Sequence, residues 1–422
     1  MKIRYFIFMV MSLLCLTQVG CHDMSYQGLN KIDTDPDSDN PQRVLMFLGT
    51  SASDSEGLKS KGTGPIVSAD GFEGKTFNIY AFQKKSSDVA VSYSTLSQED
   101  SFACLIDASI DEPGSKQGRV AVWNPESGII DWKYSADYVF YPGGESMAMP
   151  FDFFAYYVDD MLLENEDFHR TDKSVEIDIE IDGYQDLMSA VAVAGEDELK
   201  LGAEDDEKEF LYRKQSTYSY YTAQLNIHPR FVFKHHLVKL DFKIVPGQTP
   251  EFLKDLRVEK LEVYSKNKAN FVVAHKNYDP EDPDDDKLGL FFYNDKAHLE
   301  LKEKDGSPFI TRELSTIADG SEAMSMDLGT MLVAPDDGYY IYLTLSEDRD
   351  GKPITDKERN ELYVYLGNLN DTSRMGFEAG SEYLITMSVY GKMDVRVSAE
   401  LKKWGEGGDF GYDFDDISRP KN

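Results

Sequence analysis

The hydrophobic residues of this chain fall into many short segments rather than into helical stripes. Val175–Ile181 alternates strictly, with four aliphatic side chains on one face and acidic side chains on the other. This alternation is typical of a half-exposed antiparallel strand. The helical period of 3.6 is nearly absent, and Thr355–Tyr363 is the stretch that could hold one or two turns. The pattern predicts an all-β protein built from antiparallel sandwiches.

Other predicted strands are short and rich in aromatic or β-branched residues, with Gly, Pro, Ser or Asp between them. Before residue 229 they are Thr76–Gln83, Phe102–Asp107, Gly118–Trp123, Trp132–Tyr141 and Pro150–Val158. After it they are Phe231–Val245, Arg257–Tyr264, Ala269–Ala274, Leu288–Tyr293, Met324–Ala334, Gly338–Leu345, Glu361–Gly367, Glu382–Gly391 and Met393–Trp404. An acidic, loop-like stretch at Gly202–Arg213 precedes the second set. We therefore expect two sandwich domains in tandem, at 43–228 and 229–404, and an acidic, glycine-rich tail at 405–422.

The first apolar run after a polar lead is Val44–Leu48, with five consecutive apolar residues. Such a run is short enough for a strand buried on both faces and too short for a packed helix. The strand is either a permanent part of its sandwich or a removable one, whose groove another subunit fills. Losing it would expose apolar positions worth about 1.5–3 kcal/mol each when buried. Residues 43–50 are therefore a candidate exchange strand.

The N-terminus has the pattern of a secretory signal peptide. Lys2 and Arg4 precede an uncharged stretch, Tyr5–Val19, that is too short to span a bilayer comfortably. Gly20-Cys21 follows, as in a bacterial lipobox, in which the cysteine is acylated and becomes the mature N-terminus. We expect residues 1–20 to be removed and residues 21–42 to form a polar tether whose lipid on Cys21 is the only membrane anchor. Cleavage that leaves Cys21 unmodified is the alternative.

The chain is strongly acidic, with 76 Asp and Glu against 44 Lys and Arg and a formal charge of -32. Nucleic acid is excluded as a partner because phosphate binding needs a basic footprint. Cys104 is the only cysteine left after Cys21, so the mature body can form no internal disulfide and no thiolate metal cluster. We interpret Cys104, which lies within a predicted strand, as a buried and inert thiol.

Sequence motifs for chemistry are missing. The chain contains no GxSxG, HExxH, GxxxxGK[ST] or strand-linked GxGxxG pattern. His235 and His236 are neighbours on a strand and point to opposite faces, so they cannot share a metal directly, and one is expected to be packed and the other solvated. The acidic stretches at 33–40 and 279–286 lack the glycine and glutamate of a calcium loop. No catalytic residue, metal or cofactor is expected, and the chain is predicted not to be an enzyme.

Two alternatives stay open. Carboxylates are so abundant that a pair for glycoside hydrolysis could be proposed anywhere, and therefore none can be selected. A surface glycan-binding lipoprotein would need exposed aromatic platforms. Trp123, Trp132 and Trp404 are too few and too deeply placed in predicted strands to argue for it, although 25 tyrosines keep it possible.

Several stretches together, in order, resemble the fimbrillin family, the lipoprotein subunits of the type V pili of Bacteroidota. They begin with the leader that ends at Gly20-Cys21 and extend over nearly all of the mature chain. The others are FDFFAYYVDD (Phe151–Asp160), GYQDLMSA (Gly183–Ala190), FKHHLVKLDFKI (Phe233–Ile244), LVAPDDGYYIYLTL (Leu332–Leu345), FEAGSEYLITMSV (Phe377–Val389) and VRVSAELKKWGEGG (Val395–Gly408).

The resemblance implies two transthyretin-like sandwiches in a protein exported to the cell outer membrane as an acylated precursor. It implies that a surface protease clips the chain after its first strand, and that a strand from a neighbouring pilus subunit fills the groove. The exchange strand would be formed by Val44, Leu45, Met46, Phe47 and Leu48. The strand offered to a neighbour would be Val395–Leu401 or the tail beyond it. A host or bacterial surface ligand is a further expected partner.

One feature departs from the family pattern. Stalk subunits typically have Arg just after the first strand, whereas this chain has Lys59 and Lys61 there, and Arg43 precedes the strand. These three residues are the candidate processing sites. Stalk, tip and anchor roles all stay open on the sequence alone.

Overall fold

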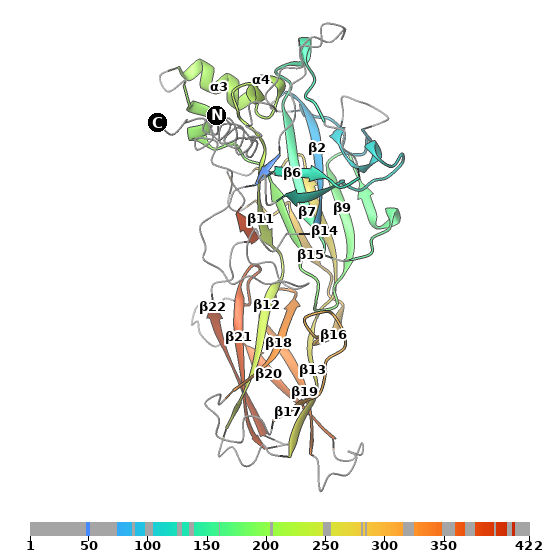
Figure 1. The fold of residues 1–422 in the computed structure, drawn as a ribbon, viewed down its shortest axis with the longest axis vertical. Coiled ribbons are helices and arrows are strands. Elements are labelled where there is room, and N and C mark those ends of the chain that lie inside the picture. The colour runs from blue at the N-terminus through green and yellow to red at the C-terminus, as the bar shows by residue number, and fades with distance from the viewer. Residues whose placement is uncertain are drawn as a thin grey trace, which may run out of the picture.

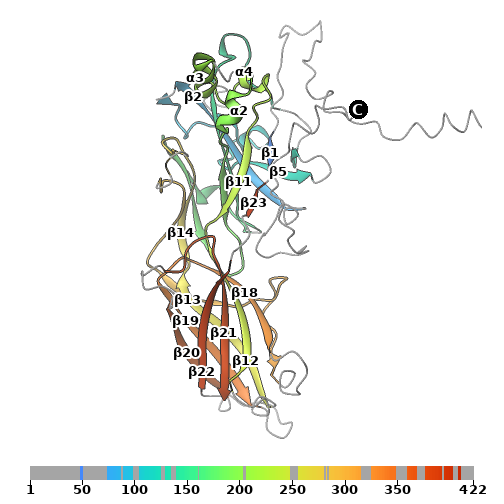
Figure 2. The same cartoon turned by 90° about the vertical axis from the view of Figure 1, so that its left-hand side faces the viewer.

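The structure is a computed structural model of the 422-residue chain. It describes residues 48–50, 74–86, 89–97, 104–124, 129–134, 139–159, 161–202, 206–247, 255–279, 282, 285–314, 325–347, 359–367, 376–391, 394–402 and 407–409. Strands dominate these residues and form four sheets. Figures 1 and 2 show the sheets in two bodies stacked along the long axis, with the short helices at the outer end of the upper body. The predicted all-β sandwich fold is confirmed.

The upper body contains the largest sheet, in the order β1-β6-β5-β2-β7-β10-β11-β23, with β3 and β4 paired to β2. Because β1 also pairs with β11, the sheet closes on itself. One face carries the aromatic side chains Phe77, Phe153 and Phe233 into a core shared with the helices. The strands are β1 Gly49–Thr50, β2 Thr76–Ser86, β3 Val89–Ala90, β4 Cys104–Ile106, β5 Arg119–Asn124, β6 Ile129–Trp132, β7 Phe151–Tyr157, β10 Met188–Val191, β11 Arg230–His235 and β23 Gly407–Asp409.

A smaller sheet, β15-β14-β9-β8, packs on the opposite face of the large one. Its strands are β8 Phe168–Arg170, β9 Ser174–Glu180, β14 Lys268–His275 and β15 Gly289–Phe292. Tyr80 and Tyr156 of the large sheet share a core with Ile177 and Ile179 of β9. The alternation read along Val175–Ile181 thus separates buried aliphatic positions from exposed acidic ones. Strands on both sides of residue 229 join in this sheet, because β14 pairs with β9.

The lower body is a sandwich of two sheets, β18-β12-β21-β22 and β16-β13-β19-β20, with β17 paired to β13. Buried and exposed positions alternate regularly along β12 and β13, and the core between the sheets is aliphatic and aromatic. β12 and β21 pair in parallel. The strands are β12 Val238–Pro246, β13 Leu256–Lys266, β16 Lys296–Glu300, β17 Arg312–Glu313, β18 Met326–Val333, β19 Gly338–Glu347, β20 Arg359–Gly367, β21 Glu382–Gly391 and β22 Asp394–Lys402.

The stretch read as one strand, Phe231–Val245, is two strands in two different sheets. β11 belongs to the large sheet of the upper body. β12, which is separated from β11 by two residues, is a central strand of the lower body. The chain changes sheets at His236-Leu237, where the Leu237 carbonyl accepts a bond from the Gly380 amide. The predicted domain boundary near residue 229 stays a prediction. The segment that follows this position contributes one strand to each body.

In the described part of the chain, three short helices lie between β10 and β11, and α3 overlaps the stretch that the sequence predicted as a loop. They are α2 Glu196–Lys200, α3 Glu207–Gln215 and α4 Tyr220–Ala223, with 3-10 turns η3 Ala108–Ile110, η4 Gly144–Ser146 and η5 Asn165–Asp167. The loop reading of Gly202–Arg213 was wrong for the part that forms α3. The Asp206 side chain caps this helix by accepting bonds from the amides of Lys208 and Glu209, both at 3.1 Å. In the other direction, residues 359–363, read as a possible helical turn, are part of strand β20.

Candidate functional site

The outer edge of β11 is shared by two segments from opposite ends of the chain. β1 pairs in parallel with its first half, Gly49 with Arg230 and Thr50 with Phe231. β23 pairs antiparallel with its second half, Asp409 with Val232 and Gly407 with Phe233. Figures 1 and 2 show β23 lying beside β11 in the upper body, away from the other C-terminal strands. Together, β1 and β23 therefore cover the part of the β11 edge that one longer strand could cover.

Leu48 fastens the N-terminal piece. It is 2% exposed and belongs to the core cluster that contains Phe231 and Phe233. Its carbonyl accepts a bond of 3.2 Å from the Ile130 amide, which ties the segment to β6 on its other side. The last residue of the predicted exchange strand is thus buried beside the strand that an incoming segment would pair with. Val44–Phe47 lie outside the described residues.

The C-terminal piece makes a weaker attachment. β23 contains three residues, two of them glycine, and its register with β11 shifts between Val232 and Phe233. Glycine places no side chain in a core and weakens a strand interior. The hydrogen bonds of such a short ladder contribute about 0.5–1.5 kcal/mol each. The edge of β11 beyond Phe231 is therefore covered by a segment that can be displaced at low energetic cost.

The outward face of β11 borders a cavity of about 540 Å³. Arg230, Val232 and Lys234 line it from β11, together with Ser189 and Val191 of β10. Val232 is 40% exposed. A strand added at this edge would place alternate side chains on the two faces of the sheet. One set would enter the core beside Phe233, and the other would lie beside this partly open surface, which carries both acidic and basic side chains.

Several predicted site residues fall outside the described residues: Cys21, Arg43, Lys59 and Lys61. Val395–Leu401, one of the two segments considered as a donated strand, is fully paired inside β22 against β21. The other, the tail, supplies β23. The sequence carried a signal for the tail that was missed, because the aromatic residues Phe410, Tyr412 and Phe414 alternate with Gly411, Asp413 and Asp415. This period of two is that of a strand.

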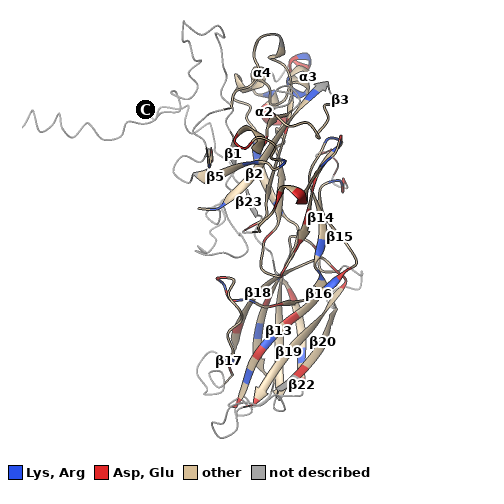
Figure 3. Ribbon diagram, turned by 90° about the vertical axis from the view of Figure 1, so that its right-hand side faces the viewer, with Lys and Arg blue, Asp and Glu red and all other residues tan. Residues whose placement is uncertain are grey.

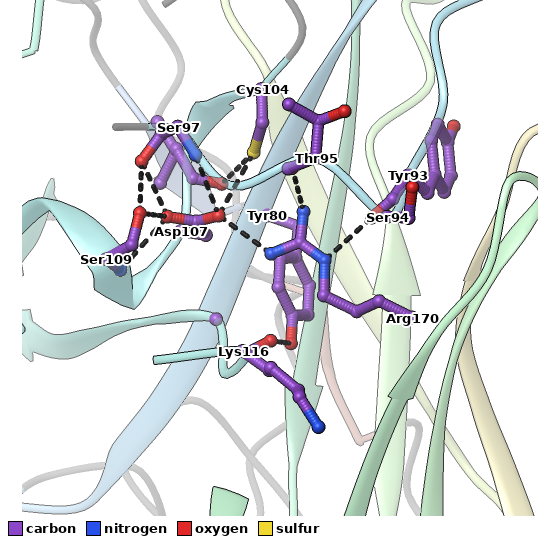
Figure 4. Close-up of polar contacts among 12 residues, drawn as sticks. Tyr80, Tyr93, Ser94, Thr95, Ser97, Cys104, Asp107, Ser109, Lys116 and Arg170 are labelled. Carbon is purple, nitrogen blue, oxygen red and sulfur yellow. Dashed lines mark hydrogen bonds and ion pairs between the residues drawn. The ribbon is translucent and has the colours of Figure 1, made fainter. Parts of the chain in front are cut away.

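The buried cluster around Asp107 is the densest polar group in the upper body (Figure 4). Arg170 donates from Nη1 to Asp107 Oδ2 at 2.8 Å, and it also donates to the carbonyls of Tyr93 and Thr95. Asp107 accepts bonds from the hydroxyls of Ser97 and Ser109. The Arg170 side chain is 3% exposed and that of Asp107 is 0% exposed. The cluster connects β8 to the segment at 93–97 and to the start of η3.

The Asp107 cluster also accounts for the low reactivity expected of the Cys104 thiol. Its thiol is completely buried and lies 3.5 Å from Asp107 Oδ2. Burial, reinforced by the Asp107 carboxylate, raises the pKa of the thiol well above its ordinary value. The thiol is therefore held in its protonated, unreactive form. Sequence reasoning missed Arg170 and Asp107, although Asp107 two residues before Ser109 is a local capping pattern that the sequence displays.

The two adjacent histidines point in different directions, as the sequence predicted. His235 Nδ1 lies 3.0 Å from Asp186 Oδ1, whereas His236 Nε2 lies 2.7 Å from the hydroxyl of Ser189. His235 is buried, as expected of one of them, and His236 is half-buried at the edge of the cavity rather than fully solvated. His236 packs edge-on against Phe271, and burial lowers its pKa to about 4. Both rings are structural parts of the junction between β10 and β11.

In the described part of the chain, no group of three or more His, Cys, Asp or Glu side chains is close enough to hold a metal ion. In the acidic stretch 279–286, the Asp285 carboxylate accepts bonds from the amides of Asp279 and Lys287. Its oxygens are thus directed at its own loop. Among the described helices, none has the length and apolar character needed to cross a bilayer.

The chain matches no family model and no curated protein sequence. It is similar to several solved structures. A proposed cell adhesion protein of Bacteroides uniformis is 18% identical over 86% of this chain and 98% of that one, with a TM-score of 0.42. The fimbrial anchor protein Mfa2 of Porphyromonas gingivalis is 10% identical over 85% of this chain and 98% of its own, with a TM-score of 0.30.

The tip fimbrial protein Mfa3 of the same organism, with a C-terminal truncation, is 10% identical over 85% of this chain and 99% of its own, with a TM-score of 0.34. The similar structures thus include bacterial fimbrial proteins, the class of protein that the sequence resembles. TM-scores this low do not support any inference about mechanism.

Proposed function

We propose that this chain is a fimbrial subunit or adhesin precursor that assembles by strand exchange at the outer edge of β11. The observation that carries the proposal is the shared edge, where β1 and β23 each cover only part of a six-residue strand. An exposed strand edge is a template for pairing with another chain. A segment that pairs along all of β11 forms a longer ladder than either short piece.

The N-terminal segment that ends in Leu48 and β1 is the piece that leaves. Its departure uncovers the core beside Phe231 and Phe233, which belong to the same cluster as Leu48. Burial of Leu48 is worth about 1.5–3 kcal/mol, so an incoming apolar side chain at this place regains that energy. The segment is held in place until the chain is cut after it, near Lys59 and Lys61, whereas a cut at Arg43 would leave the strand attached to the body.

The C-terminal tail of a neighbouring copy or of a related subunit is the piece that enters. In the isolated chain, the tail already pairs antiparallel with β11 through β23. The alternating aromatic residues Phe410, Tyr412 and Phe414 follow directly after it. They provide the apolar face that a strand needs in order to fill the groove left by Leu48. In this proposal, β23 is the intramolecular form of the contact made between subunits.

The remaining parts of the proposal concern location and role. Acylation of Cys21 anchors the precursor in the cell outer membrane with the body exposed at the surface. The mature protein is a structural component of a fimbrium without catalytic activity or cofactor. N-terminal sequencing and lipid analysis of protein taken from cell surfaces tests this part. An acylated Cys21 in assembled fibres would contradict removal of the first strand and leave an anchoring role.

A reversible lock on β1 tests strand exchange. Gly49 and Arg230 are register partners, and neighbouring strands bring such pairs within disulfide distance. The double variant Gly49→Cys/Arg230→Cys, with a specific protease site inserted beside Lys61, is cleaved in its oxidised form and then treated with a reductant. We expect a monomer before reduction and a detergent-stable ladder of polymers after it, measured by gel electrophoresis and light scattering.

The same cleaved variant without residues 410–422 is the matched control, since it keeps β23 but lacks the proposed apolar strand. It should stay monomeric after reduction. A cleaved and reduced full-length chain that remains a folded monomer, or a locked chain that polymerises equally well, would overturn strand exchange at β11.

A further inference from the structure

The outer face of the sheet β16-β13-β19-β20 in the lower body carries an array of aromatic side chains. We call it the tyrosine face and define it by Tyr264, His298, Tyr340, Tyr342, Tyr363 and Tyr365. Tyr363 is 71% exposed, Tyr365 55% and Tyr340 45%. A set of large aromatic residues exposed on one regular surface is a feature of interaction sites rather than of ordinary protein surface.

The array is continuous across all four strands. Tyr264 is the register partner of both His298 and Tyr340, and Tyr340 is in turn paired with Tyr365. The ring centroids of Tyr340 and Tyr365 lie 5.1 Å apart, and those of Tyr342 and Tyr363 lie 6.2 Å apart. With strands about 4.8 Å apart, four strands give a platform roughly 14 Å wide. Such a surface is long enough for an extended ligand.

Tyr365 lies along the sheet instead of standing away from it. A Cβ atom added to Gly338 would be 2.4 Å from the Tyr365 hydroxyl and 2.7 Å from Cζ. The ring therefore occupies the space above this glycine, which is paired with Gly367 across the two strands. Because the side chain is still 55% exposed, a broad part of the ring faces solvent. The glycine pair makes room for a flat stacking surface.

Most of the charged side chains around the tyrosine face neutralise one another. Lys260 lies 2.8 Å from Glu262 and 3.3 Å from Glu300, and Asp336 lies 2.8 Å from Lys296 and 3.9 Å from Lys266. These are three positive and three negative groups, with a sum of zero. Figure 3 shows positive and negative positions interspersed on β13, beside β19, which is largely uncharged. Glu361, two residues before Tyr363 on the same side of β20, adds one exposed carboxylate, so the surface presents a small net negative charge to a ligand.

We propose that the tyrosine face binds a neutral glycan chain. Tyrosine rings offer apolar faces to the C–H groups of sugar rings, and their hydroxyls offer hydrogen bonds to sugar hydroxyls. Within the described residues, no hydrogen bond is formed by the hydroxyls of Tyr340, Tyr363 or Tyr365, so all of them are available to a ligand. The proposal is independent of strand exchange, which uses the other body of the molecule.

The chemistry of the face favours a neutral glycan over other occupants. An acidic polymer would be repelled by a chain with a formal charge of -32. The large exposed apolar residues on this face are all tyrosines, with no exposed Leu, Ile, Val or Met among its described positions. A protein interface between copies would be enriched in Met, Phe and Trp as well as in Tyr. The nearly balanced charges and hydroxylated rings match an uncharged, polyhydroxylated ligand.

Calorimetric titration of the full-length mature chain tests the proposal. The probes are the neutral hexasaccharides of β-1,4-glucose, α-1,4-glucose and β-1,4-mannose, and hexagalacturonate as an acidic probe. We expect at least one neutral probe to bind and the acidic probe not to bind. The double variant Tyr363→Ala/Tyr365→Ala should weaken that binding about tenfold. Tyr363→Phe, which keeps the ring, should retain most of the affinity.

Tyr134→Ala is the matched control, because Tyr134 is 66% exposed but lies in the upper body, and it should bind as the parent does. The polymer ladder of the strand-exchange experiment should be unchanged in the double variant, which separates failure of this proposal from failure of the other. Absence of binding by all neutral probes, equal binding of hexagalacturonate, or a double variant that changes oligomeric state but not glycan affinity would each overturn the proposal.

Discussion

The two bodies of the molecule bury different kinds of groups. In the described part of the chain, the buried charged side chains Asp107, Arg119, Asp186 and Arg213 all belong to the upper body. The buried polar residues of the lower body are Ser265, Asn267 and Ser346, which carry no charge. Arg119 is 0% exposed and pairs with Asp111, just as Arg170 pairs with Asp107. In the upper body buried ion pairs thus add to the apolar packing, whereas the described core of the lower body is uncharged.

This difference follows from what each body must position. The upper body contains irregular segments and a sheet closed by two short pieces, and such segments leave backbone carbonyls that need partners. Arg170 is such a partner, because it donates hydrogen bonds to the carbonyls of Tyr93 and Thr95. The lower body consists of long, regularly alternating strands whose backbone groups are satisfied by the sheets themselves. Its charges can all remain at the surface, where they neutralise one another.

The largest difference between the bodies is expected when a buried cation is removed. Arg170→Met should destabilise the upper body by about 3–5 kcal/mol, because Asp107 is left buried without its partner. The free energy of unfolding is measured in urea by tryptophan fluorescence in a Trp404→Phe background, where the remaining Trp123 and Trp132 both lie in the upper body. Adding Asp107→Asn should restore part of the loss. A destabilisation below 1 kcal/mol would contradict the assigned role of this ion pair.

The second-largest difference between the two bodies is expected in how their stability changes as the pH falls. Burial, with the positive charge of Arg230, lowers the pKa of His228 to about 4, against about 6.5 in an unfolded chain. Between these values the unfolded state binds more protons, so the stability that is present above pH 6.5 is lost as the pH falls toward 4. The loss amounts to about 3 kcal/mol for one such histidine, and His236 contributes in the same direction.

The measurement is the urea midpoint of the same tryptophan transition from pH 7 to pH 4. His228→Gln should flatten the dependence, while a fluorophore attached in the lower body should report a weaker one. A pH profile that is the same in the variant and in its parent would rule out His228 as the titrating group.

The smallest effect is expected for an ion pair of the lower body. The Lys260 side chain is 38% exposed beside Glu262 and Glu300, and exposed pairs contribute about 0–1 kcal/mol. Lys260→Met should therefore change the free energy of unfolding by less than about 1 kcal/mol, and 1 M salt should remove most of the difference. A loss as large as that of Arg170→Met would show that the comparison between the two bodies is wrong.

The sequence predicted the lower body more completely than the upper one. Buried and less buried positions alternate along Tyr339–Leu345 and Glu382–Tyr390, because one face of each strand packs on the core and the other faces outward. The strand pattern of Phe231–Val245 is continuous, so the change of sheet within it was not predicted. The sequence pattern of a strand does not specify the strand with which it pairs. Helix α3 was missed because its stability comes from the Asp206 cap and the Glu209–Arg213 pair rather than from an apolar stripe.

The candidate site was predicted in part. The short apolar run ending at Leu48 was recognised as a removable strand, and Leu48 is buried beside β11. The tail was named as one of two possible donated strands, but its pairing with β11 of the same chain through β23 was not predicted, because glycine and aspartate have low strand propensity. Arg170 was equally hidden, since its partners lie more than sixty residues away in the sequence.

The crossing segment that contains β11 and β12 has a mechanical consequence. Its two strands are separated by only two residues, so a pull on the edge of β11 reaches the middle of the lower body without passing through a loop. β12 is hydrogen-bonded on both sides, antiparallel to β18 and parallel to β21. A load along this strand acts in shear and must break many bonds at once, instead of opening them one by one. The pairing of β12 on both sides therefore resists a pull along the line of β11 and β12.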